Sequence, residues 1–164
     1  MPSLPFVDVN LFVHDGAATV AAAIDSVLAQ SWPNLTLTLI DDGSGDATPD
    51  ILAAYAARDP RIRRKTNRHN GGAIGGFQRA FWFGDADFVL PKSADDLIAP
   101  DFIARTMEIL LLHSNAAMCH AQGAVFGDGL SEQQPYPASR ALHAVGPDKL
   151  ARVQHVMRHY TSSQ

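Results

Sequence analysis

Cysteine is almost absent from this sequence, and so are long apolar runs and any surplus of positive charge. The 164 residues include one cysteine, Cys119, which cannot form an intrachain disulfide and so favours a reducing compartment. No segment reaches the roughly 18 apolar residues of a membrane-spanning helix, and residues 1–5 lack the basic start of a signal peptide. The formal net charge of -4 argues against a general nucleic-acid binder. These absences predict a cytoplasmic protein with no transmembrane segment and no nucleic-acid partner.

Apolar residues are abundant enough for one folded domain. They make up 46% of the sequence and charged residues 18%, which excludes a disordered chain. A chain of this length buries roughly 70% of the surface that it exposes when unfolded, so it can form a core without disulfides. We expect a single domain with an α/β core over residues 1–121 and a C-terminal loop and helix over residues 122–164.

The first half of the sequence alternates between strand and helix patterns. Apolar residues of one parity predict a strand over 6–13, and apolar residues at helical spacing predict a helix over about 20–28. A second strand over 35–40 and a helix that begins at Thr48-Pro49 follow. Strands and helices that alternate with short connections are typical of a parallel sheet.

The alternation continues, with weaker signals, to residue 121. Its further elements are a short basic strand over 62–66, a helix from Asn70 to about Phe83, a strand over 87–90, a helix from Pro100, and a strand over 116–121. Loop signals then lead to a final helix over 147–160. The apolar stripe of that helix, around Leu150, Val153 and Met157, predicts an interface with a missing segment or with another subunit, as in a homodimer.

Polar residues follow three of the predicted strands. They are His14-Asp15, Asp41-Asp42 and the segment Ser93-Ala94-Asp95-Asp96. Ligands of an open parallel sheet bind at the carboxyl ends of its strands, where these residues would meet. Asn70-Gly71-Gly72 adds backbone N–H groups at a helix start, which suit a phosphate, and acids beside a phosphate imply a divalent cation. The residues therefore predict a metal-dependent nucleotide site.

Five sequence blocks occur in one order over about two thirds of the chain. They are residues 24–34 (IDSVLAQSWPN), 39–48 (LIDDGSGDAT), 55–62 (YAARDPRI), 70–72 (NGG) and 94–102 (ADDLIAPDF). In these blocks, residues 7–121 resemble the family 2 glycosyltransferases. The resemblance implies the GT-A fold, a three-layer α/β/α arrangement with a mostly parallel central sheet. It also implies metal-assisted, inverting transfer of a sugar from a nucleotide diphosphate, expected to be a UDP-sugar, to an acceptor hydroxyl.

The resemblance implies roles for individual residues. Asp42 stands where the family binds the base, and residues 12–15 take the place of a Pro-x-Tyr-Asn-like turn around the nucleoside. Asn70-Gly71-Gly72 lies near the sugar-nucleotide. Asp95 matches the last acid of an Asp-x-Asp motif, which holds Mg²⁺ or Mn²⁺ on the diphosphate, and Asp96 is placed to touch the ribose or the sugar.

The chain departs from the family pattern at the turn, at the metal motif and at the base. Phe12 replaces the usual proline, and His14-Asp15 replace Tyr-Asn, although His14 can still stack on a base. Ser93 stands where the first acid of Asp-x-Asp is common, so we expect weak binding of free metal. No family-like base is present, and the weak candidates are Asp96 and Asp128.

Other interpretations of these residues remain open. The chain could be a truncated or inactive module of the same fold that binds a nucleotide or a protein without turnover. Its acids could be ordinary loop and helix-start residues, and Asn70-Gly71-Gly72 could be a plain turn. Paired acids and Lys92 also occur in the pattern of a phospho-receiver domain, which the five blocks disfavour. The acceptor and the donor sugar are not predicted.

Overall fold

The chain forms two compact units, Met1–Ala104 and Arg105–Gln164. The computed structural model describes residues 3–81, 85–121, 123–125 and 134–135. Within these ranges, no helix has both the length and the apolar character needed to cross a membrane. The candidate site residues up to Asp96 all belong to the first unit, whereas Asp128 lies outside the described residues.

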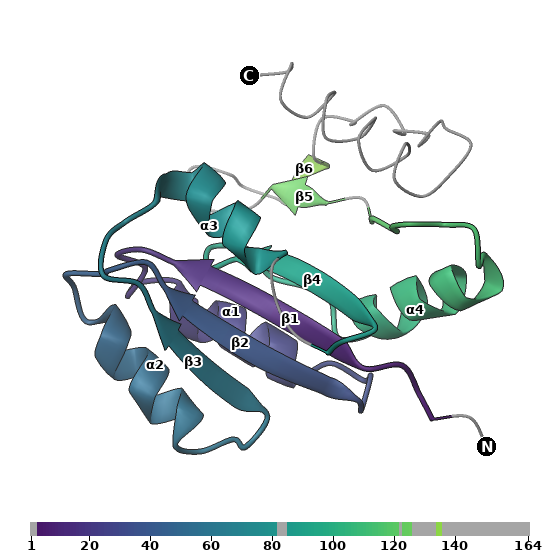
Figure 1. Ribbon diagram of the computed structural model, residues 1–164, viewed down its shortest axis with the longest axis horizontal. Helices are drawn as coiled ribbons and strands as arrows, with labels where there is room; N and C mark the ends of the chain where they lie inside the picture. The colour runs from purple at the N-terminus through teal and green to yellow at the C-terminus, as the bar shows by residue number, and fades with distance from the viewer. Residues whose placement is uncertain (1–2, 82–84, 122, 126–133, 136–164) are drawn as a thin grey trace. The chain divides into compact units, whose positions relative to one another are not determined.

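Four parallel strands form the sheet of the first unit (Figure 1). They are β1 (Val7–Val13), β2 (Leu35–Asp41), β3 (Ile62–Thr66) and β4 (Phe88–Ser93), in the spatial order β3-β2-β1-β4. β1 is central and pairs with β2 on one side and with β4 on the other. The predicted parallel α/β arrangement is confirmed, and β4 continues three residues beyond its predicted end.

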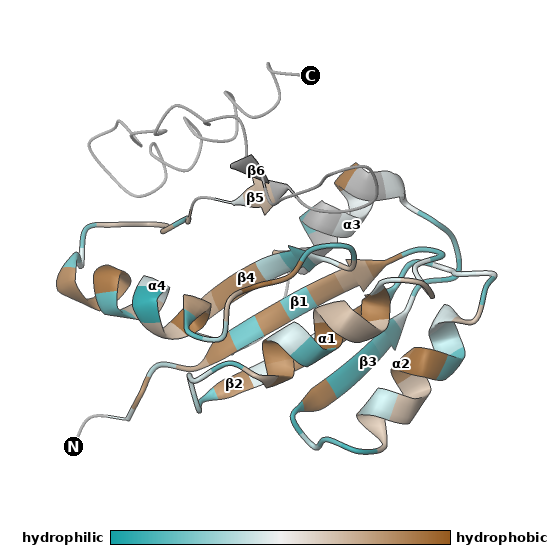
Figure 2. Cartoon of the chain, turned by 180° about the vertical axis from the view of Figure 1, so that it is seen from behind, coloured by the Kyte–Doolittle hydropathy of each residue, from teal (hydrophilic) through white to brown (hydrophobic). Residues whose placement is uncertain are grey.

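The helices lie on both faces of this sheet. α1 (Val20–Leu28) and α2 (Thr48–Ala56) cover one face and α3 (Gly72–Ala80) the other, as the opposite views of Figures 1 and 2 show. The chain steps from β1 to β2 to β3 and then returns to place β4 beyond β1. Since parallel crossovers are right-handed, this reversal puts the next helix on the opposite face. A fourth helix, α4 (Phe102–Leu112), begins at the end of the first unit.

Alternate side chains of β1 and β2 build two different layers. Val9, Leu11, Leu37 and Leu39 are fully buried and form one layer of the core. The opposite parity includes the buried polar residues Asp8, Asn10 and Thr38, and there Thr38 Oγ1 donates to Asp8 Oδ1 at 3.0 Å. Burial raises the pKa of Asp8, which the bond from Thr38 and the charges of Arg63 and Lys65 oppose.

Gln30 joins the end of α1 to the connection between β4 and α4. Its Nε2 donates to the carbonyls of Ser26 and Ala99 at 3.0 and 2.7 Å, and its Oε1 accepts from the backbone N of Ile103 at 3.0 Å. Gln30 is buried, so these bonds supply the partners that its amide needs. This connection fixes the segment that follows the acidic loop after β4.

The predicted strand over 116–121 is wrong. α4 ends at Leu112, and the backbone N of Ala116 donates to the His113 carbonyl at 2.7 Å in a turn. The residues after this turn are exposed or half-buried and have no strand partner in the described part of the chain, so their apolar character does not make them a core strand.

Other differences concern the ends of the predicted elements. β5 (Ala124–Val125) pairs antiparallel with β6 (Gln134–Pro135), a short ladder that the sequence did not predict. α3 ends at Ala80 rather than near residue 83. The predicted helix over 147–160, with its dimer stripe, lies outside the described residues.

Candidate functional site

The polar clusters meet at one edge of the sheet, where the four strands end. Val13 pairs with Asp41, Asp41 pairs with Thr66, and Phe12 pairs with Ser93. The loops after β2 and β4 flank β1 and begin about 10 Å apart, which is two strand spacings. The β1–β4 boundary is also the point where the strand order reverses, and such a switch point is where open α/β sheets bind ligands.

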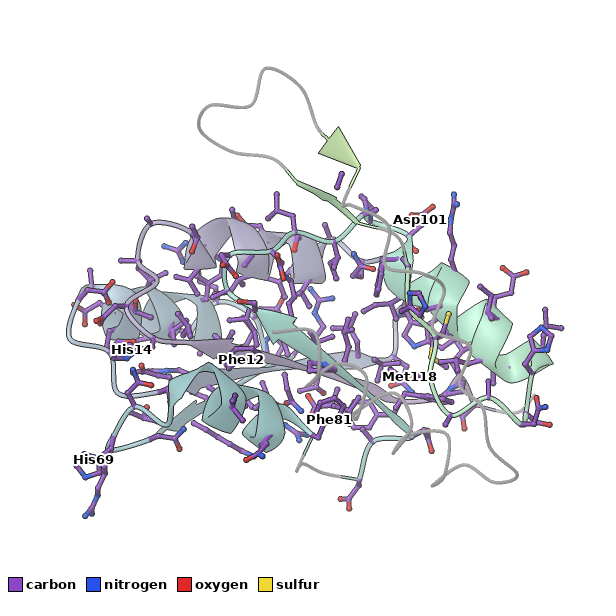
Figure 3. The ribbon with its side chains drawn as sticks, turned by 90° about the horizontal axis from the view of Figure 1, so that it is seen from above. Phe12, His14, His69, Phe81, Asp101 and Met118 are labelled. Carbon is purple, nitrogen blue, oxygen red and sulfur yellow. The ribbon has the colours of Figure 1, made fainter. Side chains whose placement is uncertain are left out.

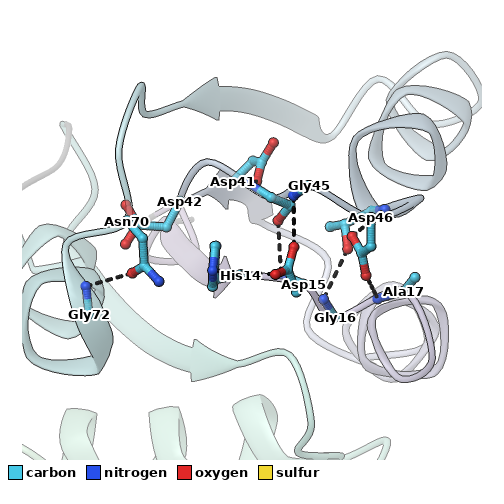
Figure 4. A network of polar contacts seen from close by, with 12 residues as sticks. His14, Asp15, Gly16, Ala17, Asp41, Asp42, Gly45, Asp46, Asn70 and Gly72 are labelled. Atoms are coloured by element: carbon cyan, nitrogen blue, oxygen red, sulfur yellow. Dashed lines mark hydrogen bonds and ion pairs between the residues drawn. The ribbon is translucent and has the colours of Figure 1, made fainter.

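The loop after β1 is tied to the loop after β2 through Asp15. Its backbone N donates to Ser44 Oγ at 3.0 Å, and its Oδ1 accepts from the backbone N of Gly45 at 2.7 Å (Figure 4). Asp15 has a φ of 50°, in the left-handed region that aspartate tolerates better than most residues. His14 Nε2 lies 3.4 Å from Asp15 Oδ2, and the His14 side chain remains partly exposed.

Asp46 joins the N-termini of two helices in the same loop pair. Its Oδ2 accepts from the backbone N of Ala17 at 3.0 Å, and its Oδ1 accepts from the backbone N of Thr48 at 2.9 Å. Thr48 Oγ1 in turn accepts from the backbone N of Gly16 at 3.0 Å. The Thr48 hydroxyl and these backbone groups lower the pKa of Asp46. The two loops therefore form one hydrogen-bonded unit.

Asp42 fastens the loop between β3 and α3. Its carboxylate is buried, and its Oδ1 accepts from Asn67 Nδ2 at 2.8 Å while its Oδ2 accepts from the backbone N of Gly71 at 2.7 Å. Gly43 follows with a φ of 77°, and a Cβ there would lie 3.4 Å from the Asn67 carbonyl. The residue predicted to bind the base thus holds the neighbouring loop in place.

The Asn70-Gly71-Gly72 segment turns into α3 as predicted. Asn70 Oδ1 accepts from the backbone N of Gly72 at 2.6 Å, and Gly72 has a φ of 70°. With Gly71 bound to Asp42, both glycine N–H groups donate to side-chain oxygens of the protein. His69, in the preceding loop, points away from the sheet (Figure 3).

The side chain of Phe12 extends from β1 to α3. An added Cβ on Gly76 would lie 3.0 Å from the Phe12 ring, so this glycine allows the helix to approach the strand closely. Phe12 is half-buried and pairs in register with Ser93 of β4. It therefore packs α3 onto the sheet beside the predicted site.

The loop after β4 carries the exposed acids. Ser93 Oγ donates to Asp95 Oδ1, and the side chains of Asp95 and Asp96 are exposed. Beneath them Lys92 is buried, and its Nζ donates to the carbonyls of Ser93, at 3.2 Å, and of Asp96. Burial lowers the pKa of Lys92, and the charges of Asp96 and Asp95 oppose that shift.

Sequence reasoning did not identify Lys92 as part of this loop. The signal was its parity in β4: it pairs with Leu11, and the two side chains lie on the same face of the sheet as the apolar layer. A lysine at such a position must find oxygen partners, because a buried ammonium without them is costly.

The acids fit a cation that is shared with a ligand rather than held by the protein alone. Across the described ranges, no three His, Cys, Asp or Glu side chains form a group that could hold a metal ion. Mg²⁺ in proteins often takes one or two carboxylates and completes its shell with phosphate oxygens and water. Asp95, one of whose oxygens accepts from Ser93, and the adjacent Asp96 match that sparse donor set.

Comparison with known proteins identifies relatives over most of the chain. The family model "Glycosyl transferase family 2" matches residues 9–160. Succinoglycan biosynthesis protein ExoO of Rhizobium meliloti is 34% identical over 114 residues, covering 66% of this chain and 30% of ExoO. Putative glycosyltransferase EpsE of Bacillus subtilis is 31% identical over 114 residues, covering 69% of this chain and 41% of EpsE. The chain thus spans less than half the length of these relatives.

Solved structures with the same fold include TarS and a mannosyltransferase. Residues 1–349 of Staphylococcus aureus TarS align with a TM-score of 0.60 at 20% identity, covering 66% of this chain and 33% of that one. The mannosyltransferase PcManGT of Pyrobaculum calidifontis, in complex with GDP-Man and Mn²⁺, aligns with a TM-score of 0.59 at 22% identity and the same coverages. TarS has also been solved with UDP and with UDP-GlcNAc. These likenesses confirm the predicted GT-A fold.

Proposed function

Because the chain belongs to glycosyl transferase family 2, we propose that it is the donor-binding part of a glycosyltransferase that uses a UDP-sugar. The observation that carries this proposal is the position of two loops, one with Asp42 and one with Asp95. They lie on opposite sides of the end of β1, at the switch point of the sheet. UDP, UDP-GlcNAc and GDP-Man bound to structural neighbours support a nucleotide-sugar as the ligand.

The interlocked loops form the nucleoside side of the proposed site. His14, partly exposed beside Asp15, is available to stack on the base, and Phe12 supports the wall formed by α3. Asp42 recognises the base through the carboxylate that also accepts from Asn67 Nδ2 and from the backbone N of Gly71. Asn70 and Gly72, at the start of α3, lie near the bound sugar-nucleotide.

The loop after β4 forms the diphosphate side. Asp95 would hold Mg²⁺ or Mn²⁺ on the diphosphate, and Asp96 would bind the ribose or the sugar. A bound cation there neutralises negative charge on the leaving diphosphate. The two exposed carboxylates alone repel a diphosphate, so their use in donor binding depends on a counter-charge.

The reaction is a direct displacement with inversion at the anomeric carbon. The bond from that carbon to the diphosphate oxygen breaks as the acceptor oxygen bonds to the carbon, and the acceptor proton passes to a base. Asp96 and Asp128 are the candidates for this base, of which Asp128 lies outside the described residues.

A second candidate is a module that binds the nucleotide or a protein partner without turnover, with a homodimer through residues 147–160 as one form. It is favoured by the acids of residues 122–164, since Asp128, Glu132 and Asp148 do not stand in the context of a family-like base. A transfer or donor-hydrolysis assay separates the candidates, because turnover by the 164-residue chain contradicts the inactive module.

Calorimetric titration with UDP tests the site. We expect UDP to bind more tightly with Mn²⁺ than without it, and this metal-dependent gain to be lost in Asp95→Ala. Asp85→Ala is the matched control. Asp85 is an exposed acid that lies just before the start of β4, whereas Asp95 follows the end of that strand. UDP affinity that is the same with and without Mn²⁺ in the wild type contradicts the metal assignment, and no UDP binding contradicts the site.

A further inference from the structure

Lys92 occupies an apolar layer of the sheet, directly below the acidic loop. Its side chain is 4% exposed, and in register it pairs with Leu11, which is fully buried. Side chains at paired positions of neighbouring strands lie on the same face, so the lysine stem runs along the core beside Leu11. An apolar residue would fill this position without the cost of burying a charge.

The Lys92 ammonium bonds both ends of the turn that carries the acids. Nζ donates to the carbonyl of Ser93 at 3.2 Å and to the carbonyl of Asp96, so a single group holds the first and last residues of the turn. Ser93 Oγ adds a bond to Asp95 Oδ1 from within the turn. The turn is thus fixed from below, and the carboxylates of Asp95 and Asp96 remain exposed on its outer side.

We propose that Lys92 is a positioning residue, which fixes the Ser93–Asp96 turn so that Asp95 and Asp96 meet a diphosphate and its cation in a preformed arrangement. This proposal rests on the donor-binding function proposed above. The need for such support is high in this chain, because Ser93 contributes a hydroxyl rather than a carboxylate and leaves few acidic ligands. Groups that orient metal ligands typically change metal affinity by about 10- to 100-fold when they are removed.

The test compares UDP binding by the full 164-residue chain and its variants, with and without Mn²⁺. In Lys92→Met, which keeps the stem and loses the donors, we expect the Mn²⁺-dependent gain in UDP affinity to fall by about tenfold or more. Binding of UDP alone should stay within about twofold, because the bonds of Lys92 go to the turn after β4, whereas Asn67 and Gly71 bind Asp42 on the other side of β1. Lys92→Gln, which keeps a shorter neutral donor, should retain more of the gain than Lys92→Met.

Lys65→Met is the matched control, since Lys65 is an exposed lysine of β3 and its variant makes the same change of charge. A folded Lys92→Met variant with an undiminished Mn²⁺-dependent gain overturns the proposal while the donor site stands. A wild-type chain that binds no UDP removes the donor site, and the role of Lys92 with it. A loss of metal-dependent gain that Lys65→Met shares equally also overturns the proposal.

A measurement on the wild type covers the case in which the Lys92 variants do not fold. The chain has three lysines, at positions 65, 92 and 149, so the side-chain ammonium signals in ¹⁵N NMR can be assigned with Lys65→Met and Lys149→Met. Addition of UDP with Mg²⁺ should shift the Lys92 signal, whereas UDP alone should shift it less. A Lys92 signal that stays unchanged while UDP and Mg²⁺ bind overturns the proposal.

Discussion

The two sides of the site use their carboxylates differently. On the β1 and β2 side, Asp15, Asp42 and Asp46 each accept hydrogen bonds from backbone groups of neighbouring loops. On the β4 side, Asp95 and Asp96 are exposed, and the Ser93 hydroxyl donates to a carboxylate oxygen of Asp95. Acids with similar places at the sheet edge therefore divide into those that hold the chain together and those directed outward.

This difference separates stability from ligand binding in a way that can be measured. Removing a carboxylate that accepts from buried backbone donors should lower the free energy of unfolding, because those donors then lack partners. Removing an exposed carboxylate should change ligand affinity and leave the free energy of unfolding nearly unchanged. Asp42 is expected to contribute to both.

The largest expected effect is that of Asp42→Ala. It removes both acceptors of the bonds from Asn67 Nδ2 and the Gly71 backbone, so the free energy of unfolding should fall by about 3 kcal/mol. Urea unfolding measures this loss, and Asp95→Ala serves as the contrast with a change within about 0.5 kcal/mol. If the two variants lose equal stability, the division between the two sides of the site is wrong.

A smaller effect is expected at the buried amide that anchors the β4 side. Gln30→Ala leaves the Ala99 carbonyl and the Ile103 backbone N without their amide partners, and should lower the free energy of unfolding by about 2 kcal/mol. Gln30→Glu is a useful companion, because it keeps the acceptor for Ile103 and loses the donor to Ala99. Chemical unfolding should give both variants a lower free energy of unfolding than the wild type. If Gln30→Ala is as stable as the wild type, residues other than Gln30 hold the connection between β4 and α4.

The smallest expected effect is a pH dependence from Asp46. Its pKa is lowered from the ordinary 3.8 by the bonds from Thr48 and Ala17, so its stabilising contribution is present above that pH and is lost as the pH falls below it. Asp46→Asn should therefore melt at a lower temperature than the wild type at pH 7, and the gap should narrow below pH 3.8. Thermal melts from pH 7 to pH 3 measure this gap, and a gap that widens on acidification refutes the assignment.

Much of the first unit could be predicted because its patterns are local. Parity and helical spacing located β1, α1 and β2 to within a residue or so, and the βαβ order predicted that Asp42 and Asp95 would share an edge. The apolar run over 116–121 misled because hydrophobicity alone does not supply a strand partner.

The bonds inside the site could not be predicted because they depend on backbone geometry and on distant partners. The positive φ of Asp15 and the contact of Asp42 with Gly71 bring together loops that are about thirty residues apart in sequence. Lys92 has the parity of Leu90, but the predicted strand ended at Leu90, so the place of the lysine in the sheet followed only from the register of β4 on β1. The sequence predicted the acids of the site from their residue type. Their different roles became clear only from the groups that donate hydrogen bonds to them.

The strand order also bears on how the chain reaches this arrangement. Val7 pairs with Leu35, which lies 28 residues further along the chain, but its partner on the other side, Phe88, lies 81 residues away. Closing the longer segment costs about 1 kcal/mol more in chain entropy, by the logarithmic dependence on loop length. β4 thus joins the sheet at a higher entropic cost than β2. The exposed acids Asp95 and Asp96 directly follow β4, so they reach their place in the site only when this strand has paired.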